Sequence, residues 1–431
     1  MNSRIVTAAL LLALLLPCAG LLGQETNFVE AKVPAFSLPD PLVTFSGKRL
    51  RSVRAWEKDR RGEILEVFSQ EMYGHVPQRP EGEHFETLSE EVVYDGLGLR
   101  KVVRIYLDGS GEHWFDALVH IPRGMGAVPF FAGLNFKGND ATLDERASSR
   151  WPYQMILGAG FGVVTAWRDS VEPDGSASVV PHSDDYCKDG GVRTWFNKGG
   201  DWGAISAWAW GLSRIMDYLE TEPLADESKV AVIGHSRLGK AALWAGANDK
   251  RFALVVSNNS GCCGAAISRR VFGENFERIS SVFPHWFSPE FMKYKNREAD
   301  FPLDQNCLAA LIAPRPLYIA SSSRDGWADP KGEWMCASSL APVYALYRLP
   351  ALKAEDNSFS SYPFTPESDY PNPEVLQLPV QGTPVSEAQM PPLDTPVAGG
   401  SVAYHIKNGK HGITAFDWAQ YLRFASRHFS R

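Results

Sequence analysis

The chain has 431 residues, of which 44% are hydrophobic and 22% are charged, and this composition is typical of a globular protein with a large core. Its 43 Lys and Arg face 50 Asp and Glu, a formal net charge of −7 without any basic run, which argues against a nucleic-acid binder. The 13 Trp, 14 Tyr and 23 Phe exclude disorder for most of the chain. Such rings also suit stacking on sugars, although core packing explains them as well.

The first segment, Met1–Gly23, is expected to be a secretory signal rather than part of the fold. It begins with a positive charge, continues with the apolar stretch Ile5–Leu16 and is too short for a spanning helix. Cleavage is expected near Gly20 or Gly23, and lipid anchoring through Cys18 ranks second. We therefore expect a secreted or periplasmic protein with no membrane segment after cleavage.

Five cysteines remain after cleavage, so at least one thiol stays unpaired or all are reduced. They are Cys187, Cys262, Cys263, Cys307 and Cys336. No spacing of His and Cys matches a metal site, and neither a metal nor another cofactor is expected.

The N-terminal part of the mature chain predicts a surface segment, a helix and antiparallel strands. Residues Gln24–Gly47 are Pro-rich and lack any period, whereas Trp56–Tyr73 has the apolar spacing of an amphipathic helix. Short β-type runs follow at Val92–Tyr94, Lys101–Leu107 and Leu118–Ile121.

From Val128 onward, short apolar runs alternate with helical patterns such as Trp202–Leu219. The runs are VPFFAGL, FGVVTAW, KVAVIG, FALVVS and PLYIAS. This alternation predicts a three-layer α/β sandwich with a mostly parallel central sheet, in one domain over residues 24–431. The Pro-rich stretch Ala351–Gly400 is a predicted insertion, either a surface excursion or an active-site lid.

Ser236 is the predicted nucleophile. The segment Lys229–Ala241 reads KVAVIGHSRLGKA, an apolar strand that enters a tight turn and then a helix. A nucleophile elbow needs this context, because the turn projects the serine from the sheet beside a helix N-terminus. The alternative is a serine that only caps an ordinary helix.

His411 is the predicted general base. In α/β-hydrolases the triad follows the chain order Ser, acid, His, and Gly409–Gly412 lies between an apolar strand and the last helix. His405 within the strand and His428 on the helix are expected to be structural, and His285 is expected to be a packed histidine.

Asp325 is the predicted acid, because a carboxylate must orient the imidazole and stabilise its charged form. It follows the strand PLYIAS, the second strand after that of the nucleophile. Asp329 precedes Pro330 and is weighed as the less favoured alternative, since this position suits a helix cap.

The sequence GHSRLGKAALWAGA resembles the G-x-S-R-x-G-K motif of the glucuronoyl esterases, carbohydrate esterase family 15. The resemblance continues over nearly the whole mature chain, which looks like a member of the bacterial branch. Its further segments are EILEVFSQEMYGHVP, GLNFKGND, FGENFERI, FPHWF, ALIAPRP, DGWADPKGEW, MPPLDTPV and AYHIKNGKHGITAFDW.

The resemblance implies an α/β-hydrolase fold and hydrolysis of the ester between 4-O-methyl-glucuronic acid of xylan and lignin alcohols. It implies that Arg237 stabilises the oxyanion, and that Lys240, Glu274 and Trp327 contact the glucuronoyl sugar. A fixed guanidinium beside the nucleophile suits a developing negative charge. For Lys240 and Glu274 the alternative is a surface ion pair.

The chain departs from the family pattern where many members carry the acid as Glu after the strand FALVVS. Asn259 aligns with that Glu, and an amide cannot hold the imidazolium charge as a carboxylate does. The acid role then falls to Asp325, as in some bacterial members. Gly412 also stands where an Asp often follows the base.

These observations predict a monomeric serine esterase that acts on a glucuronoxylan–lignin ester or on small glucuronate esters. One alternative is another carboxylesterase of the same fold, such as an acetyl xylan esterase. A second, motivated by Asn259, is a weakly active relative that binds carbohydrate.

Overall fold

The computed structural model describes residues 26–143, 150–175, 190–196, 200–353 and 390–430. The predicted signal at Met1–Gly23 and most of the predicted Pro-rich insertion lie outside the described residues.

A single nine-stranded sheet runs through these residues in the order β1-β2-β3-β5-β4-β6-β7-β8-β9. The strands are β1 (His84–Val93), β2 (Gly98–Tyr106), β3 (Trp114–Pro122), β4 (Val128–Asn135), β5 (Gly162–Trp167), β6 (Ala225–His235), β7 (Leu254–Asn258), β8 (Leu317–Ser322) and β9 (Val402–Lys407). The first three strands and β5 pair antiparallel, whereas β5, β4 and β6 to β9 pair parallel. The predicted mostly parallel α/β sheet is therefore confirmed.

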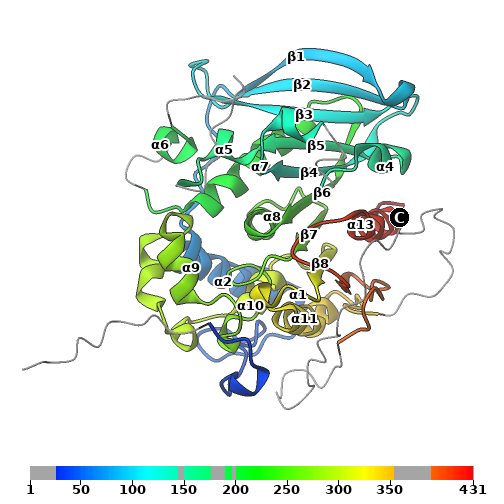
Figure 1. Cartoon of the computed structure of the whole chain (residues 1–431). Helices are drawn as coiled ribbons and strands as arrows, with labels where there is room; N and C mark the ends of the chain where they lie inside the picture. The colour runs from blue at the N-terminus through cyan, green and yellow to red at the C-terminus, as the bar shows by residue number, and fades with distance from the viewer. Residues whose placement is uncertain (1–25, 144–149, 176–189, 197–199, 354–389, 431) are drawn as a thin grey trace, which may run out of the picture.

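Helices cover both faces of the parallel strands, as Figure 1 shows. One face carries α2 (Arg61–Phe68), α7 (Ala204–Leu219), α8 (Arg237–Asn248), α10 (Gln305–Ala310) and α11 (Pro330–Ser338), and the other carries α4 (Tyr153–Gly158) and α13 (Ala415–Phe429). The shorter helices are α1 (Val53–Ala55), α3 (Asn139–Thr142), α5 (Arg168–Val171), α6 (Val192–Phe196), α9 (Phe276–Val282) and α12 (Ala341–Leu346). No helix in the described ranges is long and apolar enough to cross a membrane.

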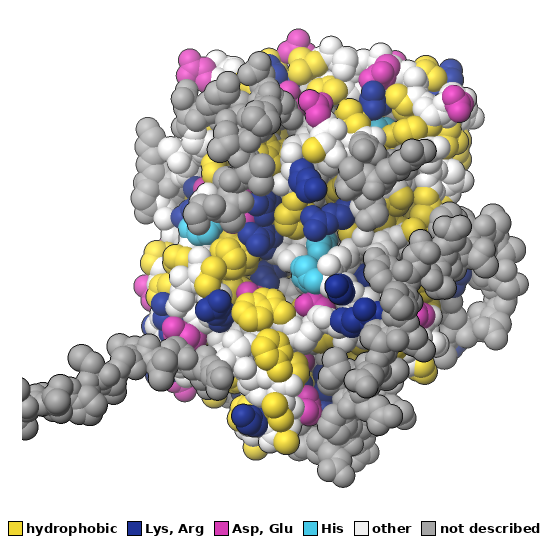
Figure 2. Space-filling view, viewed as in Figure 1, with side chains coloured by type: hydrophobic (Ala, Val, Ile, Leu, Met, Phe, Trp, Pro, Cys, Tyr) yellow, Lys and Arg dark blue, Asp and Glu magenta, His cyan; other side chains and the backbone are white. Residues whose placement is uncertain are grey.

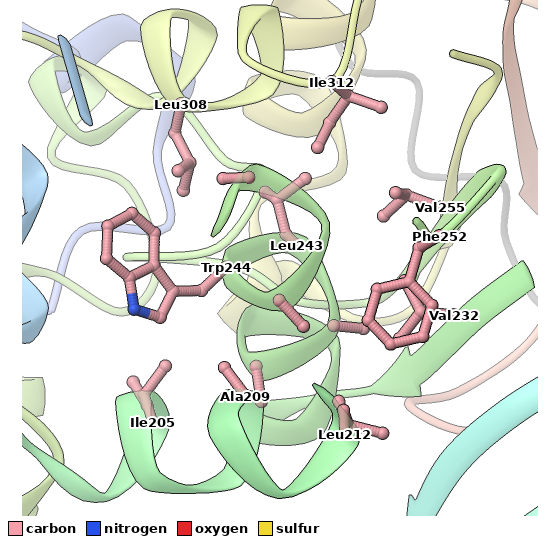
Figure 3. Packing of buried hydrophobic residues seen from close by; sticks show 14 of the residues in the cluster. Ile205, Ala209, Leu212, Val232, Leu243, Trp244, Phe252, Val255, Leu308 and Ile312 are labelled. Atoms are coloured by element: carbon pink, nitrogen blue, oxygen red, sulfur yellow. The ribbon is translucent and has the colours of Figure 1, made fainter. Parts of the chain in front are cut away.

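Alternate residues of each central strand enter different cores. On β6, Val232 packs with α7 and α8, as Figure 3 shows, whereas its neighbour Ile233 packs on the other face with α13. Successive strand side chains point to opposite faces, and both faces are covered here. The unbroken apolar runs that predicted these strands follow from this double burial.

The predicted helix at Trp56–Tyr73 is present and begins slightly earlier, at Val53. Its central α2 is flanked by π-helical turns, Trp56–Arg60 and Ser69–Tyr73. The helix ends at Gly74, whose φ of +84° is costly for other residues. A Cβ atom there would lie 2.1 Å from the Trp202 Cα, so the approach of the two backbones requires glycine.

We expect Gly74→Ala to destabilise the protein by about 2–4 kcal/mol, because it adds a backbone clash to an unfavourable φ. Thermal unfolding followed by circular dichroism measures this effect. Gly62→Ala is the matched control, since a Cβ at Gly62 in α2 meets nothing within 4 Å. The control is expected to stabilise by up to about 1 kcal/mol. Equal melting temperatures for the two variants would contradict the packing described for Gly74.

Candidate active site

Ser236 occupies a tight turn between β6 and α8. Its φ of 58° and ψ of −129° are strained for a residue with a side chain. A Cβ at Gly234 would lie 1.9 Å from the Leu238 carbonyl oxygen, so the turn closes only with glycine at this position. The predicted elbow geometry is therefore present, with Ser236 at the N-terminus of α8.

Four neighbouring parallel strands end at this edge of the sheet. Ser236, Asn259, Asp325 and His411 follow β6, β7, β8 and β9, so residues far apart in sequence meet. All four line one pocket of about 480 Å³. Figure 2 shows a hollow in the surface with cationic and histidine side chains in it. This is where open α/β sheets place their ligand sites.

His411 and Asp325 are in direct contact. The His411 Nδ1 lies 2.5 Å from the Asp325 Oδ2, and the Asp325 side chain is almost fully buried. An ionised carboxylate only accepts hydrogen bonds, so the Nδ1 donates and the Nε2 is free to accept a proton. The Asp325 Oδ1 also accepts the backbone N–H of Ala328 at 3.3 Å, which holds the carboxylate in place.

Arg237 follows the serine in the chain. Its guanidinium is oriented by Asp174, a residue that the sequence analysis did not identify. Its Nη1 donates to the Oδ2 of the buried Asp174 at 2.5 Å, and the guanidinium lies over the Phe283 and Trp286 rings. Trp286 also donates to Asp174 at 2.6 Å. His285, expected to be packed, is only partly buried and contacts Asp174 at 3.0 Å.

The charge of Asp174 is held by its partners. Burial alone would raise its pKa, but the hydrogen bond with His285 and the charges of Arg168 and Arg237 outweigh burial and lower it. Asp174 therefore stays ionised. Asp174 and Arg237 are 63 positions apart in the chain, so no local sequence motif identifies Asp174 as the partner of Arg237.

Lys240, Glu274 and Trp327 come together on another wall of the same pocket. The Lys240 Nζ donates to the Ser260 carbonyl at 2.6 Å and lies 3.4 Å from the Glu274 carboxylate. The two side chains do form an ion pair, but it is buried in the pocket wall rather than exposed on the surface. The Glu274 N–H donates to the Trp327 carbonyl at 2.9 Å, which joins the two loops.

Known proteins are similar to this chain in sequence and in fold. A model of fungal glucuronyl esterases matches residues 171–347. A carbohydrate esterase from an unidentified prokaryote is 36% identical over 94% of this chain and 92% of its own. A glucuronoyl esterase structure from Solibacter usitatus has a TM-score of 0.76 at 36% identity and covers 93% of this chain and 100% of its own. The chain belongs to the glucuronoyl esterases, carbohydrate esterase family 15.

Two further proteins of this kind are similar to the chain. A family 15 esterase structure from a marine bacterial metagenome, described as promiscuous, has a TM-score of 0.78 at 35% identity and covers 94% of this chain and 100% of its own. The 4-O-methyl-glucuronoyl methylesterase 1 of Wolfiporia cocos is 29% identical over 80% of this chain and 82% of its own. The α/β-hydrolase type of the fold follows from this membership.

Asn259, the departure noted in the sequence, supports Asp325 in this glucuronoyl esterase family member. Its Nδ2 donates to the Asp325 Oδ2 at 2.9 Å, the same oxygen that contacts His411. Its own Oδ1 accepts from the Ser322 hydroxyl at 3.1 Å, which sets the direction of the amide. This second contact helps to fix the position of the Asp325 carboxylate beside His411. The sequence alone revealed a missing Glu but not this contact.

Asp329, the less favoured acid, points away from the base. It caps α11 by accepting from the Gly332 N–H at 3.0 Å, and its carboxylate pairs with the buried Arg270 at 2.7 Å. The structure thus places Asp325 beside His411 and Asp329 in a structural ion pair. His405 is also structural, because its Nε2 contacts the buried Asp417 at 2.9 Å.

The four described cysteines are buried and form no disulfide, while Cys187 lies outside the described residues. Cys262 and Cys263, the adjacent pair, have their sulfur atoms 3.8 Å apart. In the described part of the chain, no three His, Cys, Asp or Glu side chains are arranged to hold a metal ion.

Glu333 lies buried beneath the pocket floor. It accepts the Gly261 N–H at 3.0 Å and contacts the Ser321 hydroxyl at 2.6 Å. Burial raises its pKa from 4.5 to about 8, and the nearby Asp325 and Asp329 add to the shift. The carboxyl is therefore largely protonated at neutral pH.

We expect protein stability to fall between about pH 5 and 8 through Glu333, because the folded protein there keeps a proton that the unfolded chain releases. Glu333→Gln keeps an uncharged side chain of the same shape. In this variant, stability should fall less steeply with pH than in the parent. Melting temperatures measured across that pH range would record the difference.

The exposed Glu290 provides the matched control, and Glu290→Gln should keep the parent's pH profile. A Glu333→Gln profile parallel to that of the parent would show that the buried carboxyl does not hold its proton.

Proposed function

We propose that this protein is a serine esterase that hydrolyses esters of glucuronic acid through an acyl-enzyme. The observation that carries the proposal is the His411–Asp325 hydrogen bond in the same pocket as the strained Ser236. In this mechanism the Ser236 Oγ attacks the ester carbonyl, and the His411 Nε2 takes its proton. The protonated imidazole then gives that proton to the leaving alcohol, and water releases the acid by the reverse sequence.

Asp325 orients this reaction and stabilises its charge. Its bond to the Nδ1 fixes the tautomer that leaves the Nε2 able to accept a proton, and its negative charge stabilises the imidazolium. Asn259 acts through Asp325 by holding the carboxylate in place. The chain thus carries an acid after β8, and the amide after β7 supports it.

Arg237 opposes the charge that develops on the ester oxygen. Its backbone N–H lies at the N-terminus of α8, and its guanidinium is held at the pocket wall by Asp174. Donors fixed before the reaction stabilise an oxyanion without the cost of reorientation. We assign Arg237 this role because both of its groups are available at the pocket.

The wall formed by Lys240, Glu274 and Trp327 suits the glucuronoyl sugar. Lys240 and Glu274 offer a donor and an acceptor for hydroxyl groups, and Trp327 offers an apolar ring face. The name of the Wolfiporia cocos relative supports a 4-O-methyl-glucuronoyl ester as substrate, which we extend to esters that join glucuronoxylan to lignin alcohols. We further propose that the enzyme is monomeric and is exported by the signal at Met1–Gly23.

The first test compares the parent with Ser236→Ala on benzyl glucuronate. We expect the parent to release benzyl alcohol and the variant to lose at least about a thousandfold in kcat, since no other group takes over a nucleophile. Acetylated xylose serves as the competing substrate. Faster release of acetate than of benzyl alcohol would favour an acetyl esterase, and absence of any turnover would favour a carbohydrate-binding relative.

The second test separates the two aspartates after β8. Asp325→Asn should lower kcat by about 10³–10⁴, because an amide at this position favours the wrong tautomer of the base. Asp329→Asn should instead lower stability by about 3–5 kcal/mol, since it breaks a buried ion pair with Arg270. Steady-state kinetics and urea unfolding on both variants measure this split. A larger loss of kcat in Asp329→Asn would refute the assignment of the acid.

A further inference from the structure

Two exposed aromatic rings extend the pocket outward along its rim. Trp327 lines the pocket and is 38% exposed, and Phe28, from the N-terminal segment, is 52% exposed. Their ring centroids lie 6.5 Å apart and their planes are tilted by 36°. Figure 2 shows hydrophobic side chains gathered at the rim beside the charged hollow. The two rings thus form a continuous apolar surface that begins inside the pocket.

The N-terminal segment that carries Phe28 is fixed in place. The Asn27 carbonyl accepts the Gly273 N–H at 2.8 Å, and the Phe28 ring meets Phe272 edge-on at 6.2 Å. Two residues later, Glu30 pairs with the buried Arg270 at 2.8 Å. A ring held at both sides loses little freedom when it binds a ligand, and this lowers the cost of binding.

Burial does not explain the position of Phe28. The segment is held here by an ion pair and a backbone hydrogen bond, yet about half of the Phe28 residue remains exposed to solvent. An exposed apolar surface that is continuous with a ligand pocket is a usual sign of an extended binding site. A surface made of the two aromatic rings best fits an uncharged ligand that has flat apolar faces.

We propose that Phe28 and Trp327 form a binding surface for the neutral pyranosyl residue to which the glucuronoyl branch is attached. This inference rests on the proposed function, because it places the branch in the pocket and the carrying sugar on the rim. The C–H face of a pyranose stacks on an aromatic ring, whereas its hydroxyl groups stay in solvent. Phe28 would then distinguish a substrate with a sugar chain from a small glucuronate ester.

The experiment compares two substrates, benzyl glucuronate and a xylooligosaccharide that carries one methyl-esterified glucuronoyl branch. For Phe28→Leu, which keeps apolar bulk against Trp327 but removes the ring, the ratio of kcat/KM for the oligosaccharide to that for the small ester should fall about three- to tenfold. The fall should come from KM. Phe28→Trp should restore the ratio.

Phe45→Leu is the matched control, because Phe45 is 55% exposed, packs on Arg60 and does not line the pocket. Its ratio should equal that of the parent. An equal loss on both substrates in Phe28→Leu would mean that Phe28 only supports Trp327 and would overturn the proposal, as would an unchanged ratio.

Failure of the proposed function gives a different result. If the parent hydrolyses neither ester, the esterase assignment fails. A direct binding measurement then tests whether Phe28 and Trp327 form a sugar-binding surface. Calorimetry with neutral xylohexaose and the Ser236→Ala protein should show binding that weakens about three- to tenfold when Phe28→Leu is added. Equal affinities with and without Phe28→Leu, or no binding, would overturn the surface.

Discussion

One carboxylate oxygen, the Asp325 Oδ2, organises the catalytic edge of this protein. It receives the His411 Nδ1 at 2.5 Å and the Asn259 Nδ2 at 2.9 Å, so it joins the loops after β7, β8 and β9. Both contacts hold this oxygen in place. The orientation of the His411 imidazole depends on this single atom.

The strand order brings these loops together, and it was largely predictable. Unbroken apolar runs predict buried parallel strands, and the tight glycine turn predicts Ser236 at the end of one of them. Chain order then leaves few candidates for the other roles. Strand β1 was harder to predict in full, because it is an exposed edge strand whose mostly polar residues give no hydrophobic signal. Only its last residues match the predicted run at Val92–Tyr94.

The contacts that tune the site could not be predicted from the sequence. Asp174 reaches Arg237 from 63 residues away, and the Phe28 ring meets Trp327 across almost 300 positions. Neither residue sits in a pattern that demands a function, because their roles depend on which loops meet in space. For Asn259 the sequence was misleading in another way. Its alignment suggested only the loss of a catalytic Glu, whereas its side chain donates a hydrogen bond to Asp325.

The charge of the pocket follows from pairs rather than from the net −7 of the chain. On the nucleophile helix, Arg237 is paired with Asp174 and Lys240 with Glu274. The pairs supply oriented donors without a large excess of positive charge. Hydrolysis of a uronate ester turns a neutral group into a carboxylate, and a strongly cationic pocket would hold that product more tightly than the substrate. Pairing Arg237 and Lys240 with buried anions therefore reconciles stabilisation of a transient oxyanion with release of a permanent carboxylate.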